Sequence, residues 1–318
     1  MESLIEINGL KKYFETPKGI LHAVDDVSMK FEKGSTMGIV GESGCGKSTL
    51  GRTIIHLQES TGGSIIYQGE DVTHVNQKKL MLLREDMQII FQDPFSSLNP
   101  RMTVDDTLRE PLILSNQFKR DEIDFQVKRL MDMVGITRQM RNSYPHEMDG
   151  GRRQRVCIGR ALALNPKFIV CDEPVSALDV SIQAQIINLL QDLQKELGLT
   201  YMFVTHNLSV VRHISNYLSV MYLGQLVETC PTKELFKNPL HPYTKALLSA
   251  IPTTNIHMKR ERIIIEGELV SPINPKPGCR FAARCKYACD KCHLPQKLEQ
   301  YSPDHAVACC RVRELSEF

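Results

Sequence analysis

The chain has 318 residues, 42% of them hydrophobic and 24% charged, which is enough for one large domain with a satellite or for two domains. Its 39 lysines and arginines nearly balance 37 acidic residues, so the net charge of +2 argues against a nucleic-acid-binding surface and favours a small charged ligand. No apolar run approaches the roughly 18 residues of a membrane-spanning helix, and the acidic N-terminus is unlike a secretory signal, so we expect a cytoplasmic chain.

The first predicted elements are strands. Residues 5–7 and 23–31 alternate apolar and polar side chains, as half-buried strands do. Tyr13 and Phe14 lie between them, and one of these rings could stack on an adenine base. Packing in a β-core is an equally good interpretation of Tyr13 and a weaker one of Phe14.

A glycine-rich stretch follows an apolar run at residues 37–40 and precedes a helical pattern at residues 50–57. Its residues are Gly41, Glu42, Ser43, Gly44, Cys45, Gly46, Lys47, Ser48 and Thr49. In a phosphate-binding loop, small residues let successive backbone N–H groups surround a phosphate at a helix N-terminus. Lys47 would reach the β- and γ-phosphates of a nucleotide, and Ser48 would ligate Mg²⁺. The alternative is a glycine-rich turn with a chance lysine, and the motifs downstream argue against it.

The middle of the chain combines strand and helix patterns. Strands are expected at residues 65–67 and 87–91, with Gln92 at the end of the second. Residues 95–99 form a predicted loop between two prolines, and helical patterns occupy much of residues 103–164. This block looks like a helical insertion between two parts of a sheet.

Two carboxylates follow the apolar run at residues 168–171, which is typical of a strand buried on both faces. Because ligands bind at the carboxyl ends of such strands, Asp172 is placed to bind Mg²⁺ and Glu173 to polarise an attacking water. A solvated acidic loop is the alternative.

A helix is expected at residues 181–197, and a buried strand at residues 201–204 leads to His206. A histidine at a strand end is more often a structural group than a ligand contact. In this setting His206 could hydrogen-bond a γ-phosphate, so both interpretations stay open.

Taken in order, these motifs resemble those of the nucleotide-binding subunits of ABC transporters, over essentially the whole chain. The corresponding residues are Phe14 in the aromatic A-loop, residues 41–49 in Walker A, Gln92 in the Q-loop, Gly150 and Gly151 in the signature motif, residues 168–172 in Walker B, Glu173 as catalytic base, Asp179 in the D-loop and His206 in the H-loop. The resemblance implies an ATPase that uses Mg²⁺ and has the α/β fold of an ABC-type P-loop NTPase, a RecA-like core with an antiparallel β-subdomain and a helical subdomain. It implies a nucleotide-binding domain at residues 1–252, a helical subdomain at about residues 95–165, and a C-terminal extension at residues 253–318.

Residues 91–101 and 238–248 resemble more narrowly the oligopeptide/dipeptide importer branch, which also includes nickel and glutathione importers. That branch implies a peripheral protein on the cytoplasmic face of the cell membrane. Its partners would be a second ATPase subunit, two transmembrane permease subunits and an extracytoplasmic peptide-binding protein, and ATP hydrolysis would power peptide uptake. A nickel or glutathione importer, or an ABC ATPase without a transport role, is the alternative.

The signature motif departs from the family pattern LSGGQ, because residues 148–152 read Met-Asp-Gly-Gly-Arg. In the family this motif contacts the γ-phosphate held by the partner's Walker A motif. Asp149 would bring a carboxylate toward that polyanion, with a repulsion of about 1 kcal/mol at about 4 Å even in water, which Arg152 would partly offset. We therefore expect an asymmetric heterodimer, in which the site completed by this signature is impaired and the site built on Glu173 and His206 hydrolyses ATP.

Six of the ten cysteines lie between residues 279 and 310, on a proline-rich segment. Thiolate clusters bind Zn²⁺ or an iron–sulfur cluster, and spacing does not distinguish the two. The importer branch has a cysteine pattern that holds a [4Fe–4S] cluster in some members and corresponds to Cys279, Cys285, Cys292 and Cys309. Cys289 and Cys310 fall outside that pattern, and either could replace a neighbouring ligand. Free thiols without metal are the alternative.

Overall fold

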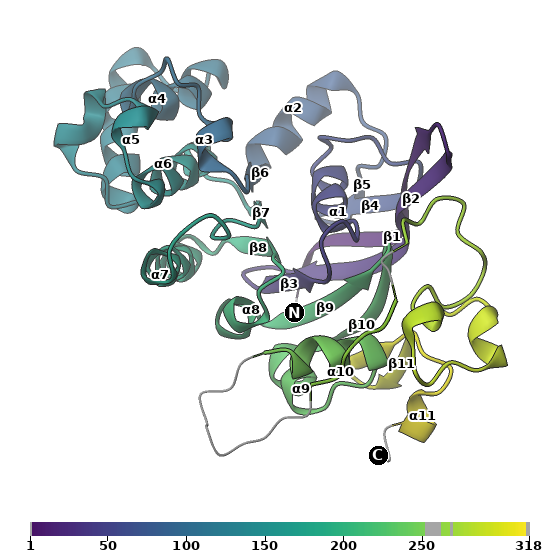
Figure 1. Cartoon of the computed structure of the whole chain (residues 1–318). Helices are drawn as coiled ribbons and strands as arrows, with labels where there is room; N and C mark the ends of the chain where they lie inside the picture. The colour runs from purple at the N-terminus through teal and green to yellow at the C-terminus, as the bar shows by residue number, and fades with distance from the viewer. Residues whose placement is uncertain (1, 252–261, 268–269, 316–318) are drawn as a thin grey trace. The chain divides into compact units, whose positions relative to one another are not determined.

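The computed structural model describes residues 2–251, 262–267 and 270–315 (Figure 1). The chain divides into two compact units. The first unit comprises residues 1–4, 31–35 and 74–204, and the second unit comprises residues 5–30, 36–73 and 205–318. Across the described ranges, no helix combines the length and the apolar character needed to cross a membrane.

The first unit is built on three parallel strands in the order β6-β7-β8. Their bounds are β6 (Met87–Ile90), β7 (Phe168–Asp172) and β8 (Thr200–Val204). Every residue of β7 and β8 is buried, which explains why both read as nearly continuous apolar runs. The strands predicted in these three regions are confirmed.

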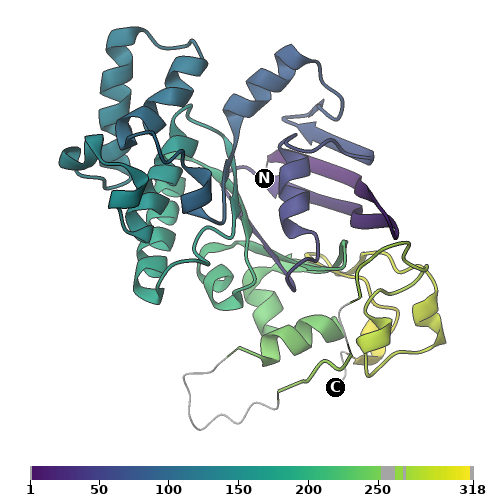
Figure 2. The same cartoon turned by 45° about the horizontal axis from the view of Figure 1, so that its top comes forward.

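Helices make up most of the remainder of the first unit (Figure 2). They are α2 (Gln77–Asp86), α3 (Pro94–Ser97), α4 (Val104–Leu114), α5 (Arg120–Met133), α6 (Gly150–Leu162) and α7 (Val180–Leu197), with the 3-10 helices η1 (Arg138–Asn142) and η2 (Pro145–Glu147). Helix α6 contacts α3, α4, α5 and α7 and also β6, so it connects the helical cluster to the strands. The helical patterns predicted between residues 103 and 164 are confirmed.

The loop predicted at residues 95–99 is partly wrong, because α3 occupies Pro94–Ser97. Asp93 caps this short helix by accepting a hydrogen bond from the Phe95 N–H at 2.9 Å. Pro94 has the fixed φ that suits a first helical position. Two residues that normally indicate a turn here start a helical turn.

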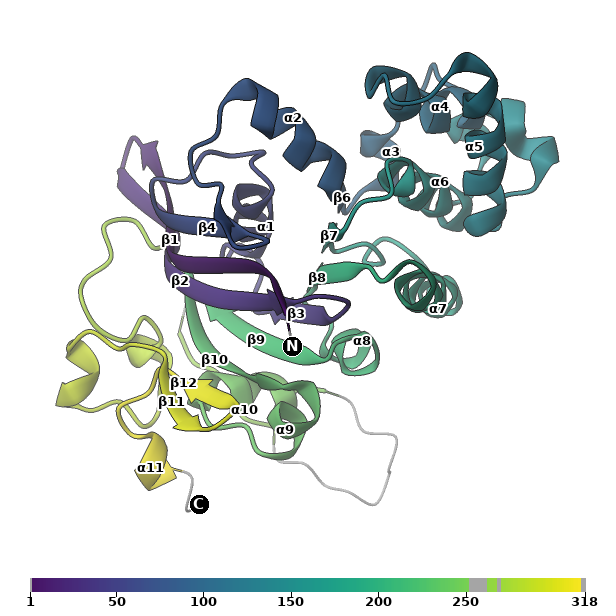
Figure 3. The same ribbon diagram turned by 180° about the vertical axis from the view of Figure 1, so that it is seen from behind.

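The second unit contains strands of two sheets (Figure 3). One sheet has the order β2-β1-β4-β5, with β1 (Ser3–Thr16), β2 (Gly19–Glu32), β4 (Gly62–Tyr67) and β5 (Glu70–Asp71). In the other, β3 (Thr36–Val40) pairs in parallel with β9 (Tyr217–Tyr222), and antiparallel strands follow: β10 (Gln225–Pro231), β12 (His305–Val307) and β11 (Glu299–Ser302). The strands predicted at residues 5–7, 23–31, 37–40 and 65–67 all lie within these elements.

The helices of the second unit are short: α1 (Lys47–Ile54), α8 (Leu208–Ile214), α9 (Thr232–Lys237), α10 (Pro242–Ser249), η3 (Ala282–Arg284), η4 (Asp290–His293) and α11 (Val312–Leu315). Helix α1 begins three residues before the predicted start at Leu50. Its first turn therefore lies directly against the glycine-rich loop, where a helix N-terminus can attract an anion.

Candidate functional site

The loop between β3 and α1 depends on glycine at three positions. Gly41, Gly44 and Gly46 have φ angles of +155°, +76° and +104°, which residues with side chains rarely adopt. A Cβ on Gly41 would lie 2.1 Å from the Met221 carbonyl oxygen, and one on Gly46 would lie 2.0 Å from that of Ala23. Apart from its chain neighbours, no described atom lies within 4 Å of the Cβ position of Gly44. The loop is thus packed on its inner side and open at its rim.

Lys47 turns back into this loop. Its side chain is buried, and Nζ donates hydrogen bonds to the carbonyl oxygens of Gly41 at 2.8 Å and Glu42 at 2.9 Å. Ser43 is exposed at the rim, and Ser48 is half-buried in the first turn of α1. The ammonium is therefore placed where phosphate oxygens could replace neutral carbonyls with stronger charge-assisted bonds.

Two other predicted loop residues have structural contacts. Thr49 is half-buried in α1, and its carbonyl oxygen accepts a hydrogen bond from the Thr53 hydroxyl. Cys45 is buried, and burial raises the pKa of its thiol. Cys45 therefore stays a neutral, small group beneath the loop.

The two candidate rings on β1 differ in their surroundings. The ring of Tyr13 stacks on His22 with a centroid distance of 3.9 Å, and its hydroxyl donates to the Asp25 carboxylate. Phe14 is half-buried, with Lys12 Nζ 4.8 Å from its ring centroid. Tyr13 is already engaged on both its face and its hydroxyl, which leaves Phe14 as the better candidate for base stacking.

In the first unit, the structure brings Gln92 and Glu173 together. Gln92 Nε2 donates to Glu173 Oε2 at 3.0 Å. Glu173 follows the buried Asp172 at the end of β7 and has a φ of +48°, an uncommon conformation for a residue with a side chain. Such a conformation costs of order 1–3 kcal/mol, and residues held in it are enriched at active sites and ligand-binding sites. The strain and the amide contact both aim the carboxylate at a defined position.

The signature glycines, at the start of α6, pack against one residue just before α7 and one in its first turn. A Cβ on Gly150 would lie 3.0 Å from Leu178 Cδ2, and one on Gly151 would lie 2.7 Å from Ile182 Cγ2. A side chain at Gly151 would therefore require Ile182 on α7 to shift, and one at Gly150 would require Leu178, just before α7, to give way by a few tenths of an ångström. The sequence identified these glycines only by resemblance, and their packing gives a second, structural reason for them.

Asp149 is the N-cap of α6. Its Oδ1 accepts a hydrogen bond from the Arg152 N–H at 2.8 Å, and its Oδ2 lies 3.3 Å from Arg152 Nε. Both side chains are more than half exposed. The carboxylate is thus directed onto its own helix N-terminus and toward an arginine, which supports the partial compensation predicted for Arg152.

The remaining predicted residues lie at the starts of two helices. Asp179 is the N-cap residue of α7 in the first unit. His206 is exposed in the second unit, one residue before Asn207, which caps α8 by accepting a hydrogen bond from the Ser209 N–H at 3.0 Å. The structure describes these two residues in different units.

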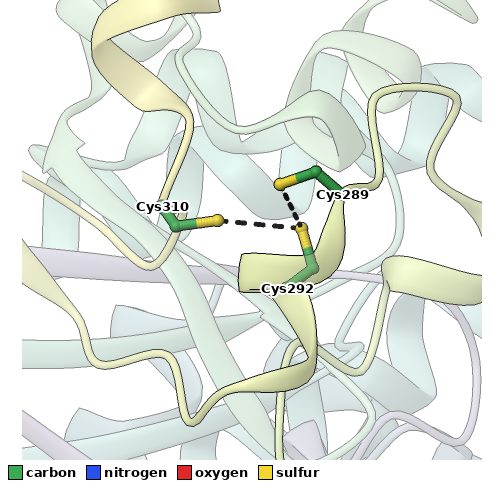
Figure 4. A group of neighbouring side chains, drawn as sticks. All are labelled: Cys289, Cys292 and Cys310. Carbon is green, nitrogen blue, oxygen red and sulfur yellow. Dashed lines mark hydrogen bonds between the residues drawn. The ribbon is translucent and has the colours of Figure 1, made fainter.

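The six C-terminal cysteines fall into two groups that share Cys292, and Figure 4 shows the group formed by Cys289, Cys292 and Cys310. The sulfur atoms of Cys289, Cys292 and Cys310 lie within 4.8 Å of one another. The four cysteines of the predicted pattern line a single small cavity together with His241 and Phe281: Cys279, Cys285, Cys292 and Cys309. Cys292 belongs to both groupings, so these residues fit a thiolate-bound group and allow more than one choice of four ligands.

Sequence reasoning missed two arginines between those cysteines. Arg280 donates to the Leu223 carbonyl oxygen and to the Asp25 carboxylate, and Arg284 binds the carboxylate of Glu42. Each arginine is adjacent to a cysteine in sequence, but nothing local indicates a partner about 240 residues away.

The comparisons with known proteins agree along the chain. A family model described as ABC transporter matches residues 24–176, and one described as Oligopeptide/dipeptide transporter, C-terminal region, matches residues 227–292. The oligopeptide transport ATP-binding protein AppF of Bacillus subtilis is 49% identical over 97% of each chain, and the dipeptide transport ATP-binding protein DppF of Haemophilus influenzae is 46% identical over 97% of each.

A solved structure shares the fold as well. The dimeric ATP-binding cassette MJ0796, bound to ADP and Pi, is 27% identical with a TM-score of 0.66, over 72% of this chain and 98% of that one. The α/β cassette fold predicted from the motifs is therefore confirmed. The chain belongs to the ATP-binding proteins of oligopeptide and dipeptide transporters, a family of ABC ATPases.

Proposed function

We propose that this protein binds and hydrolyses ATP to power import of dipeptides and oligopeptides. The observation that carries the ATPase assignment is Glu173, held in a strained conformation beside Asp172 with the Gln92 amide at 3.0 Å. The names of the relatives support peptides over nickel or glutathione as the transported class. They also argue against an ABC ATPase without a transport role.

In this proposal each predicted residue has one task. The Walker A loop, with Lys47, binds the phosphates, and Ser48, Asp172 and Gln92 hold Mg²⁺. Glu173 accepts a proton from the attacking water, and His206 contacts the γ-phosphate. Phe14 stacks on the adenine base.

We infer that the functional unit is a heterodimer with a second ATPase subunit. ABC sites pair one subunit's Walker A with the other's signature, and the solved relative is dimeric. Gly150, Gly151 and Asp179 of this chain would face the partner's nucleotide, and Asp149 would weaken that site. Hydrolysis would then depend mainly on the site that contains Glu173.

Further partners follow from the transporter family. Two transmembrane permease subunits and an extracytoplasmic peptide-binding protein would complete the importer, with this chain peripheral on the cytoplasmic face of the membrane. The exposed Phe95 on α3, three residues after Gln92 in the chain, offers an apolar contact for a permease.

We also propose that the C-terminal cysteines hold a [4Fe–4S] cluster, with Zn²⁺ as the alternative. The four pattern cysteines lining one cavity support this assignment, with Cys279, Cys285, Cys292 and Cys309 as ligands. A bound metal would clamp a segment of short elements that cannot build a core of its own.

The substitution Glu173→Gln in the purified importer complex tests the ATPase proposal. Loss of the general base should reduce ATP turnover and peptide uptake into proteoliposomes by about a hundredfold or more, with ATP affinity retained. Glu196→Gln, the same change at an exposed position of α7, should leave both unchanged. Normal turnover in the Glu173 variant would contradict the assignment.

A further inference from the structure

The segment from Cys279 to Cys310, called the C-terminal segment below, contacts the phosphate loop through Arg284, the last residue of η3. Arg284 Nη1 donates to Glu42 Oε2 at 2.8 Å, and Nη2 donates to Glu42 Oε1 at 3.3 Å. The arginine side chain is 11% exposed and the glutamate side chain 27%. A two-point arginine–carboxylate contact with this little solvent access is both strong and geometrically specific.

Glu42 is held at every polar group. Its N–H donates to the Tyr243 hydroxyl at 2.8 Å, and its carbonyl oxygen accepts from Lys47 Nζ at 2.9 Å. With the carboxylate bound to Arg284, the residue next to Gly41 has fixed partners on three sides. Loss of the Arg284 or Tyr243 contact would therefore free Glu42, whose carbonyl oxygen, with that of Gly41, accepts the hydrogen bonds of the Lys47 ammonium.

Arg284 is itself supported by packing. Its Nη1 lies 3.2 Å from the Tyr222 hydroxyl. The ring of Tyr222 packs against Tyr243 and Phe281 with centroid distances of 4.7 and 5.3 Å, and Phe281 is buried three residues before Arg284. These rings fix the turn that presents the guanidinium group to the loop.

Arg280 secures the same turn from its other end. It donates to the carbonyl oxygen of Leu223, and the next residue, Gly224, donates its N–H to the Cys45 carbonyl oxygen at 2.8 Å. The C-terminal segment thus contacts the loop at Glu42 directly, and at Cys45 through the peptide group that joins Leu223 and Gly224.

A carboxylate in a phosphate-binding loop also needs an electrostatic explanation. Unpaired, Glu42 would repel the polyanion that the loop binds, and its charge would oppose that of Lys47. Arg284 cancels this charge at a distance of 2.8 Å. The pair therefore leaves Lys47 as the uncompensated charge among these three side chains.

We propose that Arg284 is a positioning residue for ATP: acting through Glu42, it keeps the phosphate loop in its binding shape and neutralises the one carboxylate within it. This inference rests on the proposed function, because it presumes that the loop binds the phosphates of ATP. It makes the C-terminal segment part of the nucleotide site.

The test measures binding of a fluorescent ATP analogue, with Mg²⁺, to the full-length protein. Arg284→Gln should weaken affinity by about tenfold, because it leaves the Glu42 carboxylate without its partner. Adding Glu42→Gln to that variant should restore affinity to within about threefold of the starting protein, since the repulsive charge is then gone. Arg311→Gln is the matched control, because Arg311 binds the Tyr287 carbonyl oxygen and Glu314. The Arg311 variant should bind the ATP analogue with the affinity of the unsubstituted protein.

The outcomes separate the possible failures. Unchanged affinity in Arg284→Gln would overturn the proposal, and so would a double variant that binds no better than Arg284→Gln, since a role confined to folding predicts no rescue. If Arg284→Gln does not fold, Arg284→Lys replaces it in the same set of variants, because lysine keeps the charge and loses the two-point contact. Its affinity for the ATP analogue should then lie between that of the unsubstituted protein and the tenfold lower value expected for Arg284→Gln. Absence of binding by the unsubstituted protein would refute the proposed function instead.

Discussion

Asp149 caps the N-terminus of α6 and also places a negative charge on the surface that is expected to face the partner's nucleotide. Aspartate and serine are comparably good N-caps, so the aspartate costs α6 nothing in stability relative to the serine of the family pattern. The two differ in charge, and the ion pair with Arg152 is exposed and therefore worth little. The net effect on a facing nucleotide should be repulsive.

Asp149→Ser should therefore increase ATP turnover at the site that this signature completes. The measurement should use the importer complex that carries Glu173→Gln, because its remaining ATP turnover comes from the site that this chain's signature completes. We expect an increase of about fivefold, which corresponds to removing a repulsion of about 1 kcal/mol. Turnover that stays the same would show that the signature is not impaired by its charge.

At the scale of elements, the segment from Cys279 to Cys310 consists of short helices and strands, and most of its cysteines lie in the loops between them or at their ends. Its regular elements are η3, η4, β11 and β12, none longer than four residues. Burial raises the pKa of Cys279 to about 11, so in the absence of metal this thiol is protonated at neutral pH. Metal binding would require its deprotonation, and the gain in binding energy would order the segment.

Cys292→Ala should abolish metal binding, because Cys292 belongs to both groupings of cysteines. The measurement is visible absorption together with iron and zinc analysis after anaerobic purification. Cys157→Ala is the control, since Cys157 is buried in α6 far along the chain from the cluster. Cys310→Ala should retain the metal if the pattern residues are the ligands, and loss of metal there would assign Cys310 in place of Cys309.

At the scale of the whole molecule, a buried carboxylate joins three segments of the second unit. Glu228 on β10 is fully buried and accepts hydrogen bonds from the backbone N–H groups of Leu240 and His241 at 2.7 and 2.9 Å. His305 on β12 lies 2.7 Å from the same carboxylate. The edge hairpin and the start of α10 are thus held to β10 at one point.

Glu228→Ala should destabilise the protein by about 3 kcal/mol or more, because it leaves buried donors without an acceptor. Urea unfolding followed by circular dichroism measures the change. Glu314→Ala removes a carboxylate that is 59% exposed and should change stability by less than about 0.5 kcal/mol. Equal stability of the two variants would contradict the role assigned to Glu228.

Local chemistry made several parts of the molecule predictable. The buried strands β3, β7 and β8 are short apolar runs, and the glycine-rich loop follows one of them because its backbone angles suit few other residues. The family followed from motif order. The short helix α3 was missed because Pro94 indicates a turn as readily as a helix start, and only the capping contact of Asp93 distinguishes them.

By itself, the sequence determined the elements and the residue types that carry phosphate and metal chemistry, since these depend on neighbours a few positions apart. Only the tertiary structure decided which distant residues meet. The contact of Arg284 with Glu42, the grouping of Cys310 with Cys289, and the amide of Gln92 on Glu173 all join separated segments. Such contacts form only when packing of the apolar core brings those segments together, and no local pattern encodes them.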